Sequence, residues 1–291
     1  MVTRRGVAVK LAAVARAAVV ALAIALLPQG VWSALIIANL RLTPRIPWAV
    51  AVIGLLLWLM WRYLGGAYSP GRTAASRRAH LRASRVAPDV FAWALLAGGL
   101  SLAALSGFWI VLARLIRLPG SVLPPATGAP EFVVVAAVVA GASISPLCEQ
   151  AGIWGYGQVM LRRAFNRRSA IILSALIFAV APHPPFGVPL LPKILFFFLV
   201  GLTFSLTADL TESILPGLAI HMVGLLMFFV FIWPRDPGRT LVANSGVDTW
   251  FTLHAGQAIG FSLLAVVTFR HLERLSEKLR RPADDNPSLG P

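Results

Sequence analysis

Three ionisable side chains, Glu149, His183 and His221, lie inside long apolar stretches of the chain. An ionisable group at membrane depth is costly unless it is paired or hydrated, so each of the three is a candidate functional residue. A carboxylate and an imidazole together can hold and deprotonate a water molecule, which is the general-base half of amide hydrolysis. A second imidazole can donate a hydrogen bond to the oxyanion that develops. These residue types therefore fit the hydrolysis of a peptide bond.

The same trio leaves a metal-dependent alternative open. A ligand set of two histidines and one glutamate, with a free fourth position, is typical of catalytic zinc. The sequence does not separate a metal-bound water from one held by protein groups, so no cofactor is certain and a divalent metal such as zinc remains an alternative. Cys148, the single cysteine, adjoins Glu149. A buried free cysteine usually behaves as a small hydrophobic residue, so a nucleophilic role is the weaker interpretation.

The composition predicts a membrane protein that carries these residues on helices. Of its 291 residues, 58% are hydrophobic and 13% are charged, whereas soluble domains carry about 25% charged residues. The apolar residues form blocks of about 20, which suffices to cross a hydrocarbon core about 30 Å thick. We therefore expect an all-α, polytopic transmembrane bundle of about eight spans. The expected spans are 12–38, 46–64, 90–113, 132–161, 169–187, 189–208, 213–233 and 250–269.

The basic residues predict the orientation of the bundle. Seventeen of the 26 Lys and Arg residues fall in 4–10, 72–85, 162–168 and 270–281, which the expected spans place on one side, against seven on the other. The positive-inside rule makes the richer side cytoplasmic, and with it both termini. The net charge of +15 is explained by topology and by contact with anionic membrane lipids, and no nucleic-acid-binding module accompanies it.

Counting along the helices brings the three candidate residues to similar depths. Glu149 lies 13 residues before the basic end of its span, or about 20 Å from that face. His183 lies at about 21 Å from the same face and His221 at about 12 Å. The run Pro182-His183-Pro184-Pro185 breaks its helix, and broken backbone at this depth is tolerated only in protein or in a watery cavity. We therefore expect the three side chains to meet at a hydrated site.

Three motifs in this part of the chain resemble those of a known family. EQAGIWGY lies in register with a motif E-E-x-x-x-R that often continues with Gly and Tyr, and it shares the leading Glu, the Gly and the Tyr. FAVAPH resembles F-x-x-x-H with one extra residue. GLTFSLTADLTESILPGLAIHMV matches the approach to a third-motif histidine. The residues that carry the resemblance are Glu149, Gly155, Tyr156, Phe178, His183 and His221. Over about 132–233 the chain thus resembles the CPBP family of intramembrane proteases (CAAX prenyl endopeptidase and bacteriocin-processing, or Abi).

The resemblance implies roles for the candidate residues. The family's leading Glu and second-motif His, here Glu149 and His183, are taken to activate water. The third-motif His, here His221, would stabilise the oxyanion together with an Asn four residues later. Gln150, Phe178 and Gly155 would support this site.

The sequence departs from the family pattern at three positions. Gln150 replaces the second Glu, Trp154 replaces the motif Arg, and Leu225 replaces the Asn. Gln150 can still form hydrogen bonds but carries no charge, and Leu225 removes one oxyanion donor. Loss of such a donor costs about 10²–10³ in rate in other enzymes.

Three functional hypotheses follow. The leading one is an integral, multi-pass peptidase of the bacterial plasma membrane that cleaves a peptide or membrane-protein substrate. The alternative is a catalytically impaired pseudoprotease that binds a membrane peptide, lipid or partner protein. A third is a small transporter with Glu149 as proton relay, against which stand the missing internal repeat and the missing second carboxylate.

The domain organisation follows from the motifs. Residues 1–131 are expected to hold N-terminal spans and a basic cytoplasmic loop at 67–89, and residues 132–233 to form the core bundle with the site. Residues 234–291 are expected to form an external loop, a last span and a polar cytoplasmic tail, which its composition predicts to be disordered.

Overall fold

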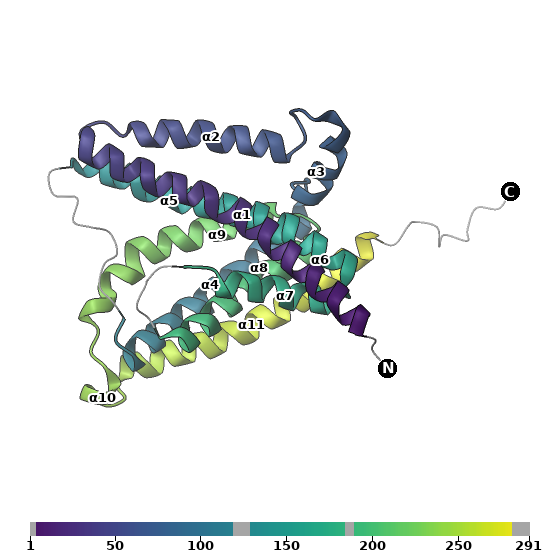
Figure 1. The fold of residues 1–291 in the computed structure, drawn as a ribbon. Coiled ribbons are helices and arrows are strands. Elements are labelled where there is room, and N and C mark those ends of the chain that lie inside the picture. The colour runs from purple at the N-terminus through teal and green to yellow at the C-terminus, as the bar shows by residue number, and fades with distance from the viewer. Residues whose placement is uncertain (1–3, 119–128, 184–188, 281–291) are drawn as a thin grey trace.

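The described residues, 4–118, 129–183 and 189–280, form an all-α bundle without strands in a computed structural model (Figure 1). The helices are α1 (Arg4–Leu42), α2 (Trp48–Leu64), η1 (Gly71–Thr73), α3 (Ala74–Leu81), α4 (Pro88–Leu115), α5 (Glu131–Glu149), η2 (Gln150–Gly157), α6 (Gln158–Ala164), α7 (Arg167–Val180), α8 (Leu190–Thr211), α9 (Leu215–Met227), η3 (Phe228–Ile232), η4 (Trp233–Gly238), α10 (Val242–Ser245) and α11 (Thr249–Arg280). The predicted fold class is confirmed.

Fewer helices than the expected eight are long enough to span a membrane. Within the described residues six qualify by length and composition, among them the continuous helix of 34 residues that α5, η2 and α6 form. The other two expected spans are α2, with 17 residues, and α7, with 14. The prediction of a span over 169–187 is wrong about its end, because α7 stops at Val180. Ala181 is extended, as a residue before proline tends to be.

The two ends of the bundle differ in which segments they carry. The start of α1, the end of α11, α3 and α6 lie at one end, and α10 lies at the other (Figure 1). The segments in which the basic residues cluster thus share one end, which agrees with the expected sidedness. The orientation in the membrane stays a prediction, and the tail expected to be disordered lies outside the described residues.

The basic loop at 67–89 is folded onto the bundle by its arginines. The Arg77 side chain is buried and donates hydrogen bonds to the carbonyls of Tyr63 and Tyr68. Arg82, which has a positive φ of 53°, donates from Nη2 to the Ala208 carbonyl in the last turn of α8 at 2.7 Å. A cation is favourable at the C-terminal end of a helix, so this arginine stabilises the end of α8.

An ion pair joins the C-terminal end of α4 to the residue that precedes α11. Arg114 donates two hydrogen bonds to the Asp248 carboxylate, at 2.9 and 3.2 Å. This contact lowers the pKa of the Asp248 carboxyl, which precedes α11. The pair helps to hold the start of α11 beside the end of α4.

Close packing of α1 against η2 determines where the middle of the long helix lies. Ala17, Ala21 and Ala25 recur every four residues on α1 and are fully buried. They face Gly152 and Gly157, and a Cβ added to Gly152 would lie 2.4 Å from the Ala21 carbonyl oxygen. The helices approach this closely because both surfaces are small, as is common between membrane helices.

The segment η2 is a π-helix of eight residues. A π-helix is rare, accommodates an extra residue in the helix and often occurs at functional sites. Here it begins directly after Glu149, so the backbone changes its winding at the candidate acid. The expected span 132–161 is therefore helical as predicted, but its winding is irregular in the middle.

We predict that Gly152→Ala destabilises the protein by about 2 kcal/mol, because the added methyl group overpacks the contact with α1. Thermal unfolding in detergent measures the change. Gly54→Ala is the matched control, since a Cβ there meets nothing within 4 Å and alanine is the better helix former by about 0.5–1 kcal/mol. Equal unfolding temperatures for the two variants would contradict the close contact.

We predict that the end of the bundle with α3 faces the cytoplasm. In a Cys148→Ala background, Arg78→Cys on α3 and Val247→Cys before α11 place one exposed thiol at each end. An impermeant thiol reagent should label Val247→Cys in intact cells and Arg78→Cys only after the membrane is opened. The reverse pattern would overturn the predicted orientation.

Candidate active site

Glu149 and His221 face each other across the boundary between α5 and α9. Each of the two side chains is 6% exposed, and His221 Nε2 lies 3.6 Å from Glu149 Oε2. His221 stacks on Phe204, with ring centroids 4.5 Å apart, which fixes the plane of the imidazole. The structure thus brings together two of the three predicted catalytic residues in direct proximity.

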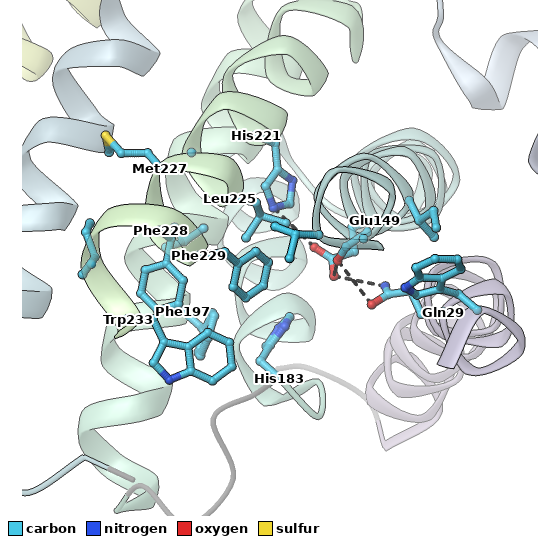
Figure 2. Close-up of a pocket in the computed structure, with 18 of the residues that line it drawn as sticks. Gln29, Glu149, His183, Phe197, His221, Leu225, Met227, Phe228, Phe229 and Trp233 are labelled. Carbon is cyan, nitrogen blue, oxygen red and sulfur yellow. Dashed lines mark hydrogen bonds and ion pairs between the residues drawn. The ribbon is translucent and has the colours of Figure 1, made fainter. Parts of the chain in front are cut away.

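The other carboxylate oxygen of Glu149 is held by two donors. Oε1 accepts a hydrogen bond from Ser145 Oγ at 2.7 Å and one from Gln29 Nε2 at 3.1 Å. Ser145 lies one turn earlier on α5, whereas Gln29 comes from α1 (Figure 2). Oε1 is therefore engaged on the protein side, and Oε2 is the oxygen that lies towards His221.

His183 is positioned by the end of α7. Its Nε2 lies 2.7 Å from the Phe178 carbonyl oxygen, and its own carbonyl accepts a hydrogen bond from Lys193. The ring stacks on Phe197, with centroids 4.2 Å apart. The described residues show no hydrogen bond or ion pair from His183 to Glu149, and Figure 2 draws it apart from the carboxylate. The structure places the contact to Glu149 on His221 instead.

All three predicted residues line one cavity. The cavity has a volume of about 610 Å³ and lies between α1 and α5 on one side and α4, α8 and α9 on the other. Its polar lining includes Glu149, His183 and His221, while most of its wall is apolar and rich in aromatic rings such as Phe228 and Trp233. An apolar cavity with a few convergent polar groups is the usual form of a ligand site.

The cavity extends along the bundle away from the end that carries α3 and α6. On α5 its lining runs from Glu149 back to Val134, which is 15 residues or about 22 Å of helix. On α1 it runs from Leu26 to Leu40. Glu149 and His221 therefore lie at one end of a long, mostly apolar space.

The three residues expected to support the site occupy different surroundings. Phe178 lines the cavity and contacts His183 through its ring and its carbonyl. Gln150 is fully buried against Gly217 on α9, and neither of its amide atoms has a hydrogen-bond partner among the described residues. Gly155 allows α3 to approach, since a Cβ there would lie 3.1 Å from the carbonyls of His80 and Leu81.

Trp154, which stands in place of the motif arginine, is a core residue. It is fully buried among the rings of Phe178, Phe204 and His221. Its Nε1 donates to Ser205 Oγ at 2.9 Å. Trp154 therefore supports one side of the His221 ring by packing, and its single polar atom is satisfied.

The residues do not fit a three-ligand metal centre in this arrangement. Among the described residues, no three His, Cys, Asp or Glu side chains lie close enough together to hold a metal ion. Glu149 and His221 approach each other, but His183 Nε2 is engaged with a carbonyl oxygen. The expected set of Glu149, His183 and His221 as metal ligands is therefore not assembled.

Two functional candidates, Gln29 and Ser145, are missing from the sequence-based prediction. Ser145 lies four residues before Glu149, a spacing that places both on one face of a helix. Gln29 continues the four-residue spacing of the buried alanines on α1, and that spacing is its only signal in the sequence. Pairing two helices separated by about 120 residues cannot be derived from spacing alone.

We predict that restoring the motif arginine, in Trp154→Arg, destabilises the protein by more than about 3 kcal/mol, because it buries a cation without a partner. Trp154→Phe should cost only about 1–2 kcal/mol through the lost hydrogen bond and contact area. Thermal unfolding measures both, with exposed Trp58→Phe as control. A stable Trp154→Arg protein would show that the core accommodates the charge.

Residues 131–227 match the family model described as type II CAAX prenyl endopeptidase Rce1-like. No match was found to a curated protein or to a solved structure. The matched segment runs from the start of α5 to the end of α9 and includes Glu149, His183 and His221. The predicted resemblance is confirmed, and the segment that forms the core of the bundle is similar to the type II CAAX prenyl endopeptidases.

Proposed function

We propose that this protein is a CPBP-type intramembrane endopeptidase that hydrolyses a peptide bond with water activated by Glu149. The observation that carries the proposal is the approach of Glu149 Oε2 to His221 Nε2, at 3.6 Å, at one end of a mostly apolar cavity. The separation exceeds a direct hydrogen bond, so both atoms are available to a water molecule or substrate that lies on the cavity side of the pair. The proposal places the protein in the bacterial plasma membrane, where membrane lipids surround it.

Each polar group has a role in this mechanism. Glu149 Oε2 takes a proton from the attacking water and returns it to the leaving amine. His221 Nε2 donates to the oxygen of the tetrahedral intermediate. His183 Nε2 donates to the Phe178 carbonyl, so its Nδ1 is the acceptor and can hold a water proton.

One observation favours the alternative of a pseudoprotease that binds a membrane peptide, lipid or partner protein. Leu225 lines the cavity one turn beyond His221, where the family pattern calls for an asparagine. An apolar side chain there donates no hydrogen bond to an oxyanion. The cavity would then bind a substrate-like segment without cleaving it.

We predict that Glu149→Gln lowers the cleavage rate of membrane-embedded peptides by at least about 10³-fold, because it removes the general base. His221→Ala should cost about 10²–10³-fold as an oxyanion donor. Purified protein in lipid nanodiscs and a peptide library provide the assay. Glu131→Gln, at the exposed start of the same helix, is the matched control and should leave the rate unchanged.

The same assay separates the two candidate functions. Background cleavage that is equal in the wild type, Glu149→Gln and His221→Ala would rule out the peptidase. Retained binding of a library peptide by all three would then support the pseudoprotease.

A further inference from the structure

Helix α1 contributes to the candidate site although it lies outside the segment similar to the endopeptidase family. The matched segment begins at residue 131, and Gln29 Nε2 reaches Glu149 Oε1 from 120 positions earlier in the chain. The surroundings of Glu149 are therefore completed by a helix that the family comparison does not include.

The position of Gln29 follows from the packing of α1 on η2. Ala17, Ala21 and Ala25 form a stripe with a four-residue repeat, and Gln29 is the next member of the same stripe. Residues four apart share a helix face. The close contact of the stripe with Gly152 thus fixes the position of α1 along the bundle axis, and with it the level at which the Gln29 amide meets Glu149.

The orientation of the Gln29 amide is itself constrained. Its Nε2 donates to the Ala25 carbonyl at 2.9 Å as well as to Glu149, and its Oε1 accepts from Ser145 Oγ at 3.2 Å. The amide nitrogen thus faces two oxygens and the amide oxygen faces a hydroxyl, which matches the donors and acceptors of the group. The Ser145 hydroxyl has a single proton, which is shared between Glu149 Oε1, the nearer acceptor at 2.7 Å, and Gln29 Oε1 at 3.2 Å. The three side chains thus form one connected cluster at Glu149 Oε1.

We propose that Gln29 is a positioning residue that fixes the rotation of the Glu149 carboxylate, so that Oε2 faces His221 and the cavity. Without it, a single donor, Ser145 on the same helix, would hold Oε1, and the carboxylate would be free to turn towards α1. A donor to the ionised carboxylate also favours its charged form, which a base requires. This role rests on the proposed function of Glu149 as the base, and it makes α1 part of the machinery.

The test compares Gln29→Met with a matched variant, Gln257→Met. Methionine keeps the length of the side chain and removes the amide. Gln257 donates from Nε2 to the Ala103 carbonyl, and its Oε1 lies 2.9 Å from His254 Nδ1. Gln257→Met therefore removes amide hydrogen bonds of similar kind, including one between α11 and α4, at a residue that does not line the cavity. Thermal unfolding of both variants reports the loss of stability that a purely structural role would cause.

The first measurement is steady-state cleavage. We expect kcat of Gln29→Met to fall about tenfold to a hundredfold, the value of one hydrogen bond to a charged group. KM should stay unchanged because the polar atoms of the Gln29 amide are already engaged by Ala25, Glu149 and Ser145 and are not free to bind a substrate. Gln257→Met should keep the kcat of the wild type.

The second measurement does not depend on cleavage. An apolar carbodiimide reacts with protonated carboxyl groups, and mass spectrometry quantifies its adduct on Glu149. At one fixed pH we expect Glu149 to be labelled several times faster in Gln29→Met than in the wild type or Gln257→Met. Ser145→Ala should act in the same direction because it removes the other donor to Oε1.

The outcomes separate this inference from the proposed function. Unchanged labelling of Glu149 in Gln29→Met would overturn the role of Gln29, whether or not the wild type cleaves peptides. Faster labelling without any Glu149-dependent cleavage would support the contact between Gln29 and Glu149 while refuting the peptidase. An equal loss of kcat and of stability in Gln257→Met and Gln29→Met would also overturn the positioning role, because Gln29 would then act only through the stability of the fold.

Discussion

A carboxylate inside an apolar bundle needs polar groups beside its oxygens, and several elements of the fold supply them around Glu149. Ser145 and Gln29 donate to Oε1, and His221 lies beyond Oε2. An unpaired charge in such surroundings would cost several kcal/mol. Helices α1, α5 and α9 therefore all contribute polar groups at the Glu149 carboxylate, and the cavity begins at this carboxylate.

The close packing on α1 and the π-helix η2 are the structural means of this arrangement. Small residues on both surfaces allow α1 to lie against η2, as Gly152 and Ala21 show. The π-helix changes the winding directly after Glu149, so that Gln150 turns towards Gly217 on α9 while Trp154 packs among Phe178 and Phe204. A regular α-helix would distribute these side chains differently around its axis.

The sequence was sufficient to predict an all-α bundle of long apolar helices, because apolar block length and helical rise depend on local residues alone. The same counting led us to expect Glu149, His183 and His221 at one site, and the structure brings Glu149 and His221 together. The counting did not predict the pairing of Glu149 with His221 over His183, because rotations of helices about their axes follow from packing between distant segments. Gln29 was missed for the same reason, and the early end of α7 at Val180 shows that the proline run outweighed the apolar pattern that precedes it.

The departures from the family pattern at Gln150 and Trp154 have the same character, because each places a neutral residue where the family pattern has a charged one. The family places an acid and a base four residues apart at these positions, and this chain has a neutral residue at both. Each side chain is fully buried, and the amide of Gln150 finds no partner among the described residues. A glutamate at position 150 would face the same lack of partners with a net charge, since Trp154 supplies no cation. Two neutral residues leave no unpaired buried charge at these positions, whereas one buried charge without its partner would be strongly destabilising. Trp154 packs against the His221 ring, so the departures at Gln150 and Trp154 do not by themselves disrupt the site. Leu225 differs from them, because it lines the cavity itself and places an apolar side chain where the family pattern has a hydrogen-bond donor.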